Sequence, residues 1–466
     1  MEEKTAMEQW KEKLLMQKKN GMTRVSEDDV ALADEFCEEY KKFLDLSKTE
    51  REAVTYAIDA LEQADFVPFD KETQSRPGDR VYYVNRGKAI IAATFGKKKC
   101  AKGVRITAAH IDSPRLDLKP NPLYEEKELA FFKTHYYGGI KKYQWTAIPL
   151  ALHGCVVKKD GTSVTVNLGE EEDDPQFCVT DLLPHLALDQ MSKPMKDAIS
   201  GEALNVLVGS RPFENSAESN AVKLNIMKLI YEKYGIVEED FLSAELEMVP
   251  AFSARDIGFD RSMIGSYGHD DRVCAYTALQ AQIDCDHPEY TTVTVLADKE
   301  EVGSDGNTGM QCSYLQDFIA DLARLEGVEG RDVLANSTCL SADVNAAFDP
   351  AYSNVFEEKN SAFLNYGVVV TKYTGARGKS ATSDASAEFM GEVRRMLDEE
   401  NIVWQTGELG KVDVGGGGTV AKYIAKLNVD VVDVGVPVLS MHAPFEIVSK
   451  LDVYMTYRAF MAFHRQ

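Results

Sequence analysis

The chain has 466 residues, of which 44% are apolar and 27% charged, so it can bury a large core and is long enough for two or three domains. Its net charge of −23 argues against a nucleic-acid partner and against an anionic membrane surface, because both are polyanions. The N-terminus lacks the basic start of a signal peptide, and no apolar run approaches the roughly 20 residues of a membrane helix. The eight cysteines include no Cys-x-x-Cys pair. We therefore expect a cytoplasmic protein whose thiols are reduced.

The first part of the chain predicts helices followed by strands. A charged amphipathic stretch over residues 5–20 predicts a first helix. Ser26 and Thr49 each begin a capping box, with an acidic residue three positions later, which predicts that a helix starts after each of them. Apolar runs at 81–85 and 88–95 then predict two paired strands.

A third strand, predicted over residues 104–110, ends in a possible site. His110 closes the strand, Asp112 follows two residues later, and Pro114 prevents an ordinary continuation of the strand. A histidine in this position is more often a core or surface group than a ligand. The carboxylate of Asp112 could nevertheless orient the imidazole or a bound water.

The pattern changes after Pro114. Residues 146–157 and 163–168 predict strands joined by a hairpin turn, and 221–230 predicts a helix. The alternation of strands and helices found elsewhere is missing here, so we interpret 119–250 as an inserted β-rich domain that builds oligomer contacts or a lid. Residues 1–118 and 251–466 then form one α/β domain with a mixed β-sheet flanked by helices.

Two acidic pairs follow the inserted region. Asp270 and Asp271 precede a predicted helix at 273–283, and capping of the helix explains one of these carboxylates better than both. The buried strand predicted at 292–297 ends in a loop that contains Glu300 and Glu301. A solvated acidic turn is the alternative reading. In an α/β sheet, however, chemistry is located where strands end, and adjacent carboxylates there can divide metal binding and proton transfer between them.

The last third of the chain supplies further strand ends and a glycine-rich loop. Predicted strands at 337–343 and 438–442 end in Asp343 and His442, and a helix is predicted over 383–400. The loop Gly415–Gly418 and Thr419 lacks the lysine or the spacing of a phosphate-binding loop, so we interpret it as a close backbone approach to a ligand.

The predicted strand ends and the start of one predicted helix therefore carry two histidines and several acidic residues, which we consider together. Two imidazoles and several carboxylates suit two divalent metals that share one carboxylate. Such a centre lowers the pKa of a bound water from about 16 to near 7, and a free carboxylate beside it can pass a proton to a leaving amine. This chemistry predicts amide hydrolysis. The residues are His110, Asp112, Asp270, Glu300, Glu301, Asp343 and His442.

With these residues in view, the chain resembles the aspartyl aminopeptidase family, which includes the vacuolar aminopeptidase I type. The resemblance covers nearly the whole chain and rests on five motifs in order: His110-Ile-Asp-Ser-Pro114, Gly268-His-Asp-Asp-Arg272, Asp298-Lys-Glu-Glu-Val-Gly-Ser304, Ser341-Ala-Asp343 and Met441-His442. It implies a metallopeptidase fold of the phosphorylase/hydrolase-like type, interrupted by a dimerisation domain, and a dodecamer built from dimers. It also implies two zinc ions, with Mn or Co as alternatives, and peptide substrates that begin with an acidic residue.

The resemblance also implies individual roles. One metal would be held by His110, Asp270 and Asp343, and the other by Asp270, Glu301 and His442. Glu300 would be the general base and later the acid, and Asp112 would support His110. His185 would reach the active site of a neighbouring subunit, although its sequence context fits a surface or core histidine equally well. The substrate would contact Lys372, Gly417 and Thr419, with Arg377 and Lys379 as further cations for an acidic residue.

Two other functions fit the same residues. A two-metal aminopeptidase with broad or glutamyl-selective specificity would use the same centre. A non-catalytic assembly protein on this scaffold is a rival of another class, which the intact Glu300 and the complete set of five ligand candidates disfavour.

Overall fold

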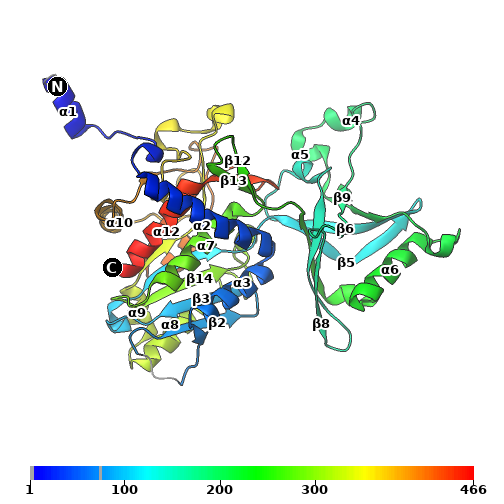
Figure 1. The fold of residues 1–466 in the computed structure, drawn as a ribbon, viewed down its shortest axis with the longest axis horizontal. Coiled ribbons are helices and arrows are strands. Elements are labelled where there is room, and N and C mark those ends of the chain that lie inside the picture. The colour runs from blue at the N-terminus through cyan, green and yellow to red at the C-terminus, as the bar shows by residue number, and fades with distance from the viewer. Residues whose placement is uncertain (1–4, 73–75) are drawn as a thin grey trace.

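A computed structural model describes residues 5–72 and 76–466, which fold into two parts that lie side by side (Figure 1). The larger part contains a nine-stranded sheet, a five-stranded sheet and most of the helices. The smaller part contains a seven-stranded sheet with three helices. This arrangement of mixed sheets and flanking helices confirms the predicted α/β fold class. Among the described residues, no helix has both the length and the apolar character needed to cross a membrane.

The nine-stranded sheet is mixed. The strands β14, β4, β15 and β19 are parallel neighbours at its centre, while β3 and β17 run antiparallel to this group on either side. In spatial order the strands are β1 (Val67–Pro68), β2 (Arg80–Asn85), β3 (Ala89–Thr94), β14 (Thr292–Ala297), β4 (Arg105–His110), β15 (Thr338–Ser341), β19 (Asp430–Gly435), β17 (Val368–Thr371) and β18 (Trp404–Thr406).

Helices cover both faces of this sheet. Side chains alternate across β3, so that Ile90 joins one core cluster and Ile91 joins the other. The first cluster is packed by α2 (Glu27–Leu46), α3 (Glu50–Gln63), α7 (His269–Asp284), α10 (Ala387–Glu399) and α12 (Lys450–Arg465). The second is packed by α8 (Tyr314–Leu325), α9 (Gly330–Ala335) and α11 (Ala421–Ala425). Because the sheet is buried on both faces, its strands are nearly continuous apolar runs, which is why they could be recognised in the sequence.

The helix starts predicted from capping boxes are confirmed, whereas several other boundaries are wrong. Ser26 and Thr49 accept hydrogen bonds from backbone N–H groups three residues later and open α2 and α3. The first helix, α1 (Ala6–Leu14), is shorter than predicted. The helix predicted over 383–400 begins at Ala387, because the side chain of Ser386 caps it, and the strand predicted from 146 begins at Leu150, after a 3₁₀ turn.

The seven-stranded sheet is formed by the segment that follows β4. It is antiparallel throughout and has its own apolar core, which includes the buried Trp145. In spatial order its strands are β8 (Ser163–Leu168), β7 (Leu150–Val157), β11 (Ala244–Pro250), β5 (Arg115–Glu126), β6 (Leu129–Tyr137), β10 (Val206–Gly209) and β9 (Cys178–Val179). The helices α4 (Leu188–Met191), α5 (Met195–Ala198) and α6 (Ala221–Tyr234) lie with this sheet (Figure 1).

The five-stranded sheet is small and joins distant parts of the chain. Its strands in spatial order are β12 (Arg255–Ile257), β13 (Met263–Ser266), β21 (Glu446–Ser449), β20 (Pro437–Leu439) and β16 (Asn345–Ala346). The pairing of β13 with β21 brings the start of α7 beside the turn between β20 and β21. Two segments that are more than 150 residues apart in the sequence therefore meet here.

Candidate metal centre

The nine-stranded sheet brings three segments to one edge. Since β14, β4 and β15 are parallel neighbours, their C-terminal ends lie at the same edge. The pairing aligns Ala297 with His110 and Ser341 with Ala108. The loops that follow β14 and β15 therefore bring three acidic residues to the level of this histidine: Glu300, Glu301 and Asp343.

The five-stranded sheet supplies the other side of the centre. Asp270 lies in the first turn of α7, just after β13. His442 lies in the turn after β20, so the strand predicted over 438–442 is wrong at its end, which is Leu439. Glu446, the first residue of β21, is buried, and its carboxylate accepts hydrogen bonds from the backbone N–H groups of Asp270 (3.0 Å) and His442 (2.7 Å). This one carboxylate therefore holds the two backbones in a fixed relation.

Asp270 lies between the two imidazoles. Its Oδ1 is 3.1 Å from Nε2 of His110, and its Oδ2 is 3.2 Å from Nε2 of His442. A second carboxylate faces each ring, because Asp343 Oδ1 is 3.9 Å from His110 Nε2 and Glu301 Oε1 is 3.6 Å from His442 Nε2. The arrangement suits two adjacent cations that share Asp270.

The other nitrogen of each imidazole is hydrogen-bonded away from the centre. Nδ1 of His110 is 3.0 Å from the backbone oxygen of Asp112, and Nδ1 of His442 is 2.8 Å from the backbone oxygen of Gly139. A backbone oxygen only accepts, so both rings carry a proton on Nδ1. Both therefore turn Nε2 toward Asp270, as metal-binding histidines do.

Asp112 is fully buried and organises the loop after β14. Its Oδ1 accepts from the backbone N–H of Glu300 (3.1 Å), and its Oδ2 accepts from the backbone N–H of Glu301 (3.2 Å) and from the hydroxyl of Tyr137 (2.7 Å). His110 Nδ1 is also 3.3 Å from Oδ1. The contact with His110, the hydrogen bond from Tyr137 and the charge of Arg115 hold the pKa of Asp112 below its usual range despite burial, so the carboxylate remains ionised.

The centre concentrates acidic side chains around two imidazoles, which form the ion pairs found for these acids in the described chain. Within the described part of the chain, no Lys or Arg forms an ion pair with any of its seven acids, which are Asp112, Asp270, Asp271, Glu300, Glu301, Asp343 and Glu446. Burial and the neighbouring carboxylate of Asp270 hold the pKa of Glu301 well above its usual range. Burial alone would lower the pKa of His442, but the hydrogen bond to Asp270 and the charge of Glu301 raise it to about 10.

The raised pKa values of Glu301 and His442 mean that protons on these groups compensate part of the negative charge of the site. Metal ions displace protons from imidazoles and carboxylates when they bind. In the described structure, Oε1 of Glu301 and Oδ1 of Asp271 are buried and accept no hydrogen bond. One ligand atom from each of His110, Asp270 and Glu301 lies within 4.8 Å of the others, and the same holds for His110, Asp271 and Asp343. The residues therefore fit divalent cations, and their nitrogen and oxygen donors suit zinc.

Glu300 has the electrostatics of a general base. Burial is the main cause that raises its pKa to about 7, with His110 opposing the shift and Asp112 adding to it. An acid whose pKa lies near neutrality can accept a proton and later return it. Glu300 follows Lys299, which adopts a left-handed backbone (φ 72°), and it opens the 3₁₀ helix η7 (Glu300–Val302).

In the described chain, no hydrogen bond or ion pair joins the other predicted residues to the candidate metal centre. His185 is exposed in the loop before α4, and no hydrogen bond or ion pair joins it to the centre in the described chain. Lys372 forms an ion pair with Asp384. The backbone N–H of Gly417 donates to Thr374, and the hydroxyl of Thr419 donates to Asp433 over 2.7 Å.

Three residues of the centre did not emerge as candidates from the sequence. Asp271 adjoins Asp270, and the weakness of capping as an explanation for both carboxylates was a signal for it. Tyr137 and Glu446 left no signal, because each acts through a contact made only after distant segments pair. Motif spacing cannot detect such contacts.

Comparisons with known proteins agree with this geometry. A family model described as "Aminopeptidase I zinc metalloprotease (M18)" matches residues 43–464. A Clostridium acetobutylicum protein named "Probable M18 family aminopeptidase 1" is 50% identical over 460 residues, which cover 97% of this chain and 98% of that protein. The crystal structure of an M18-family aminopeptidase from Thermotoga maritima has a TM-score of 0.92 at 44% identity and covers 97% of this chain and 99% of that one.

A more distant structure shares the fold. The mApe1 dodecamer of S. cerevisiae has a TM-score of 0.75 at 19% identity, covering 94% of this chain and 97% of that one. At this identity the likeness concerns the fold alone.

Proposed function

Because this chain belongs to the aminopeptidase I zinc metalloprotease (M18) family and is therefore a zinc aminopeptidase, we propose that it holds two metal ions and releases N-terminal Asp or Glu from peptides. The observation that supports the two-metal centre most directly is that the two carboxylate oxygens of Asp270 face different imidazoles, those of His110 and His442.

In this proposal the ligands divide into two sets. His110, Asp270 and Asp343 hold one ion, and Asp270, Glu301 and His442 hold the other, with Asp270 bridging. When bound, zinc lowers the pKa of water and polarises the carbonyl of the peptide bond, and the same donors also accept Mn or Co. Asp271 lies beside the first set and is a further candidate ligand.

Glu300 moves the proton. Its carboxylate accepts one from the attacking water and transfers it to the leaving amine, for which a pKa near 7 is suitable. Asp112 holds both the Glu300 backbone and the imidazole of His110, so the base and one ligand share a support.

We also propose that the chain assembles into dimers and larger homo-oligomers, because one loop has an exposed apolar surface. The loop around α4 exposes large apolar side chains that one chain leaves uncovered: Leu182, Leu183, Leu186, Leu188, Met191 and Met195. We propose that residues 119–250, together with the start of β5 at Arg115, form a dimerisation domain. We also propose that the enzyme is a dodecamer as in the yeast mApe1 structure, and that it acts in the cytoplasm, where its eight free cysteines stay reduced.

His185 lies in this same exposed loop, so we assign it to the active site of a neighbouring subunit. Replacing it with alanine is expected to lower kcat/KM about tenfold or more, the effect of losing one hydrogen bond of roughly 1.5 kcal/mol, while bound zinc stays at the wild-type level. Kinetics and metal analysis of the assembled protein check this, with His287→Ala, another exposed histidine, as the control. Loss of zinc would show that His185 is a ligand instead.

A cationic surface supports the acidic preference. A cavity of about 180 Å³ is lined by Arg377, Lys379 and Lys411, with Glu408 as its acid. Lys379 shares Asp384 with Lys372, whereas no ion pair is found for Arg377 in the described chain. No ion pair is found for Lys411 in the described chain either, but its Nζ donates to the backbone oxygen of Asn354, so Arg377 is the cation that we propose for a substrate carboxylate.

Hydrolysis of Asp-, Glu-, Leu- and Lys-anilides tests the proposal. The protein is stripped with a chelator and assayed before and after zinc, Mn or Co is restored. We expect metal-dependent cleavage that favours Asp or Glu. Restored cleavage of Leu or Lys would keep the chemistry and overturn the acidic preference. The absence of cleavage from intact, metal-loaded assemblies would favour the non-catalytic assembly protein over the proposed function.

A further inference from the structure

The segment Tyr137-Gly138-Gly139, at the end of β6, reaches the metal centre from the seven-stranded sheet. The hydroxyl of Tyr137, a residue only 7% exposed, donates to Oδ2 of Asp112 over 2.7 Å. The backbone oxygen of Gly139 accepts from Nδ1 of His442 over 2.8 Å. Gly138 has a φ of +76°, and a Cβ there would lie 3.2 Å from Oε2 of Glu301. Tyr137 and Gly139 thus hydrogen-bond to members of the centre, and Gly138 between them lies close to Glu301.

These contacts act on both imidazoles. Gly139 fixes the proton of His442 on Nδ1 directly. Tyr137 acts on His110 through Asp112, which holds the Nδ1 side of that ring. Burial and the charge of Asp112 hold the pKa of the tyrosine well above its usual range, so its hydroxyl is a neutral donor. Partners of this kind orient a metal-binding histidine and increase its basicity.

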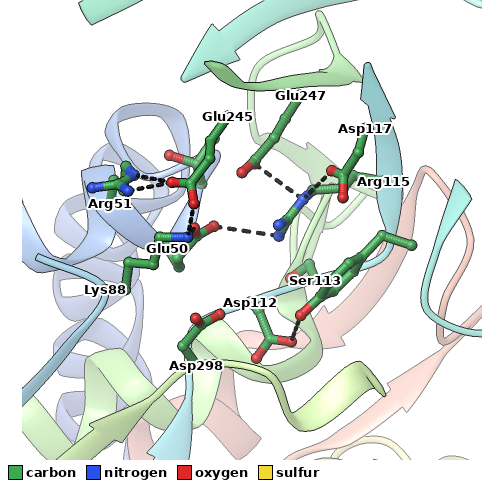
Figure 2. Close-up of polar contacts among 12 residues, drawn as sticks. Glu50, Arg51, Lys88, Asp112, Ser113, Arg115, Asp117, Glu245, Glu247 and Asp298 are labelled. Atoms are coloured by element: carbon green, nitrogen blue, oxygen red, sulfur yellow. Dashed lines mark hydrogen bonds and ion pairs between the residues drawn. The ribbon is translucent and has the colours of Figure 1, made fainter. Parts of the chain in front are cut away.

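The tyrosine ring is itself held in place. Arg115 pairs with Tyr137 across β5 and β6, and its guanidinium carbon lies 4.0 Å from the centre of the ring. Arg115 is buried and forms ion pairs with Glu50 of α3 (3.3 Å) and Glu247 of β11 (3.2 Å), and also with Asp117 (Figure 2). Because Glu50 comes from the larger part of the molecule and Glu247 from the smaller part, this network fixes the two parts together next to Asp112.

We propose that Tyr137-Gly138-Gly139 is a positioning segment through which the seven-stranded sheet orients both histidine ligands, with Tyr137 controlling His110 and hence zinc affinity. The inference rests on the proposed metal sites. Tyr137 contacts neither imidazole, so it is a positioning residue and not a catalytic one. Its removal should weaken metal binding without changing how substrate binds to the loaded enzyme.

Tyr137→Phe removes the hydroxyl and keeps the ring over Arg115. We expect zinc affinity, measured by competition with a chromophoric chelator, to fall about 10–100-fold, as is typical when the partner of a metal ligand is lost. At saturating zinc, KM for an anilide substrate should equal that of the wild type. Tyr136→Phe is the matched control, because this neighbouring tyrosine on β6 is 40% exposed and should leave zinc affinity unchanged.

Two further variants separate positioning from general damage. In an Asp112→Ala background the tyrosine has no carboxylate to hold, so Tyr137→Phe should then have no additional effect on zinc affinity. Gly138→Ala, which places a methyl group against Glu301, should also weaken zinc binding, and thermal unfolding of the metal-free proteins checks that each variant folds. Equal zinc affinity in Tyr137→Phe and wild type would overturn the inference. Wild-type protein that binds no zinc would instead overturn the proposed function, and with it this inference.

Discussion

Replacing Glu300 with glutamine is expected to lower kcat by about 10²–10⁴-fold, the range that general acid–base catalysis contributes. The amide has nearly the same shape as the carboxylate, but it cannot accept a proton from water. The backbone N–H of residue 300 would still donate to Asp112, so the loop should keep its position. The measurement is kcat on the best anilide substrate at saturating zinc.

The acid side of the pH profile should reflect the same residue. Burial raises the pKa of Glu300 to about 7, so its protonated form accumulates as the pH falls below this value. A base must be ionised, and activity should therefore decrease with falling pH. Bound cations favour the ionised form, so the loss should occur at or below pH 7.

Metal analysis separates the base from a ligand. Glu300→Gln should retain the zinc content of the wild type, and Asp305→Asn, an exposed change in the same loop, should affect neither zinc nor kcat. Turnover close to the wild-type value in the zinc-loaded Glu300→Gln protein would refute the role of Glu300 as base. Loss of zinc from this variant would show that Glu300 is a ligand.

The strand ends were recognisable because burial leaves a clear pattern. The run at 292–297 consists of threonine and apolar residues and is buried throughout in β14, and it ends in consecutive charged residues where the sheet ends. The same contrast marks His110 at the end of β4. What the sequence could not supply was the order of strands, since placing β14 and β15 on either side of β4 depends on pairing between distant segments. That order is what brings Glu300 and Asp343 to His110.

Contacts that cross between sheets were also beyond prediction. Tyr137 is one of 20 tyrosines in the chain and lies in an amphipathic strand, and only the pairing of β5 with β6 aims its hydroxyl at Asp112. Lys372 was predicted from the resemblance to contact substrate, but the sequence did not indicate that Asp384 would form an ion pair with it. The resemblance therefore supplied candidate cations for substrate binding, but the sequence did not show which of them already has an acidic partner.

Asp270→Asn is expected to remove both metals and with them the activity. Each oxygen of this carboxylate faces a different imidazole, at 3.1 and 3.2 Å. An amide offers one weak oxygen donor, and its NH₂ group would point at the other cation site. Since losing an outer partner of a ligand already costs about 10–100-fold in affinity, losing a shared ligand should cost more at both sites. Zinc per chain after dialysis is the measurement.

Asp343→Asn is the comparison that distinguishes a ligand of one metal site from a ligand shared by both. This acid faces only His110, at 3.9 Å from Nε2, so its loss should weaken one site and leave the site with Glu301 and His442 occupied. Two zinc ions retained in Asp270→Asn would refute the bridge. One retained ion would have a specific explanation, because Asp271 lies with His110 and Asp343 and could complete that site without Asp270. In that case Asp270→Asn combined with Asp271→Asn should lose the remaining zinc.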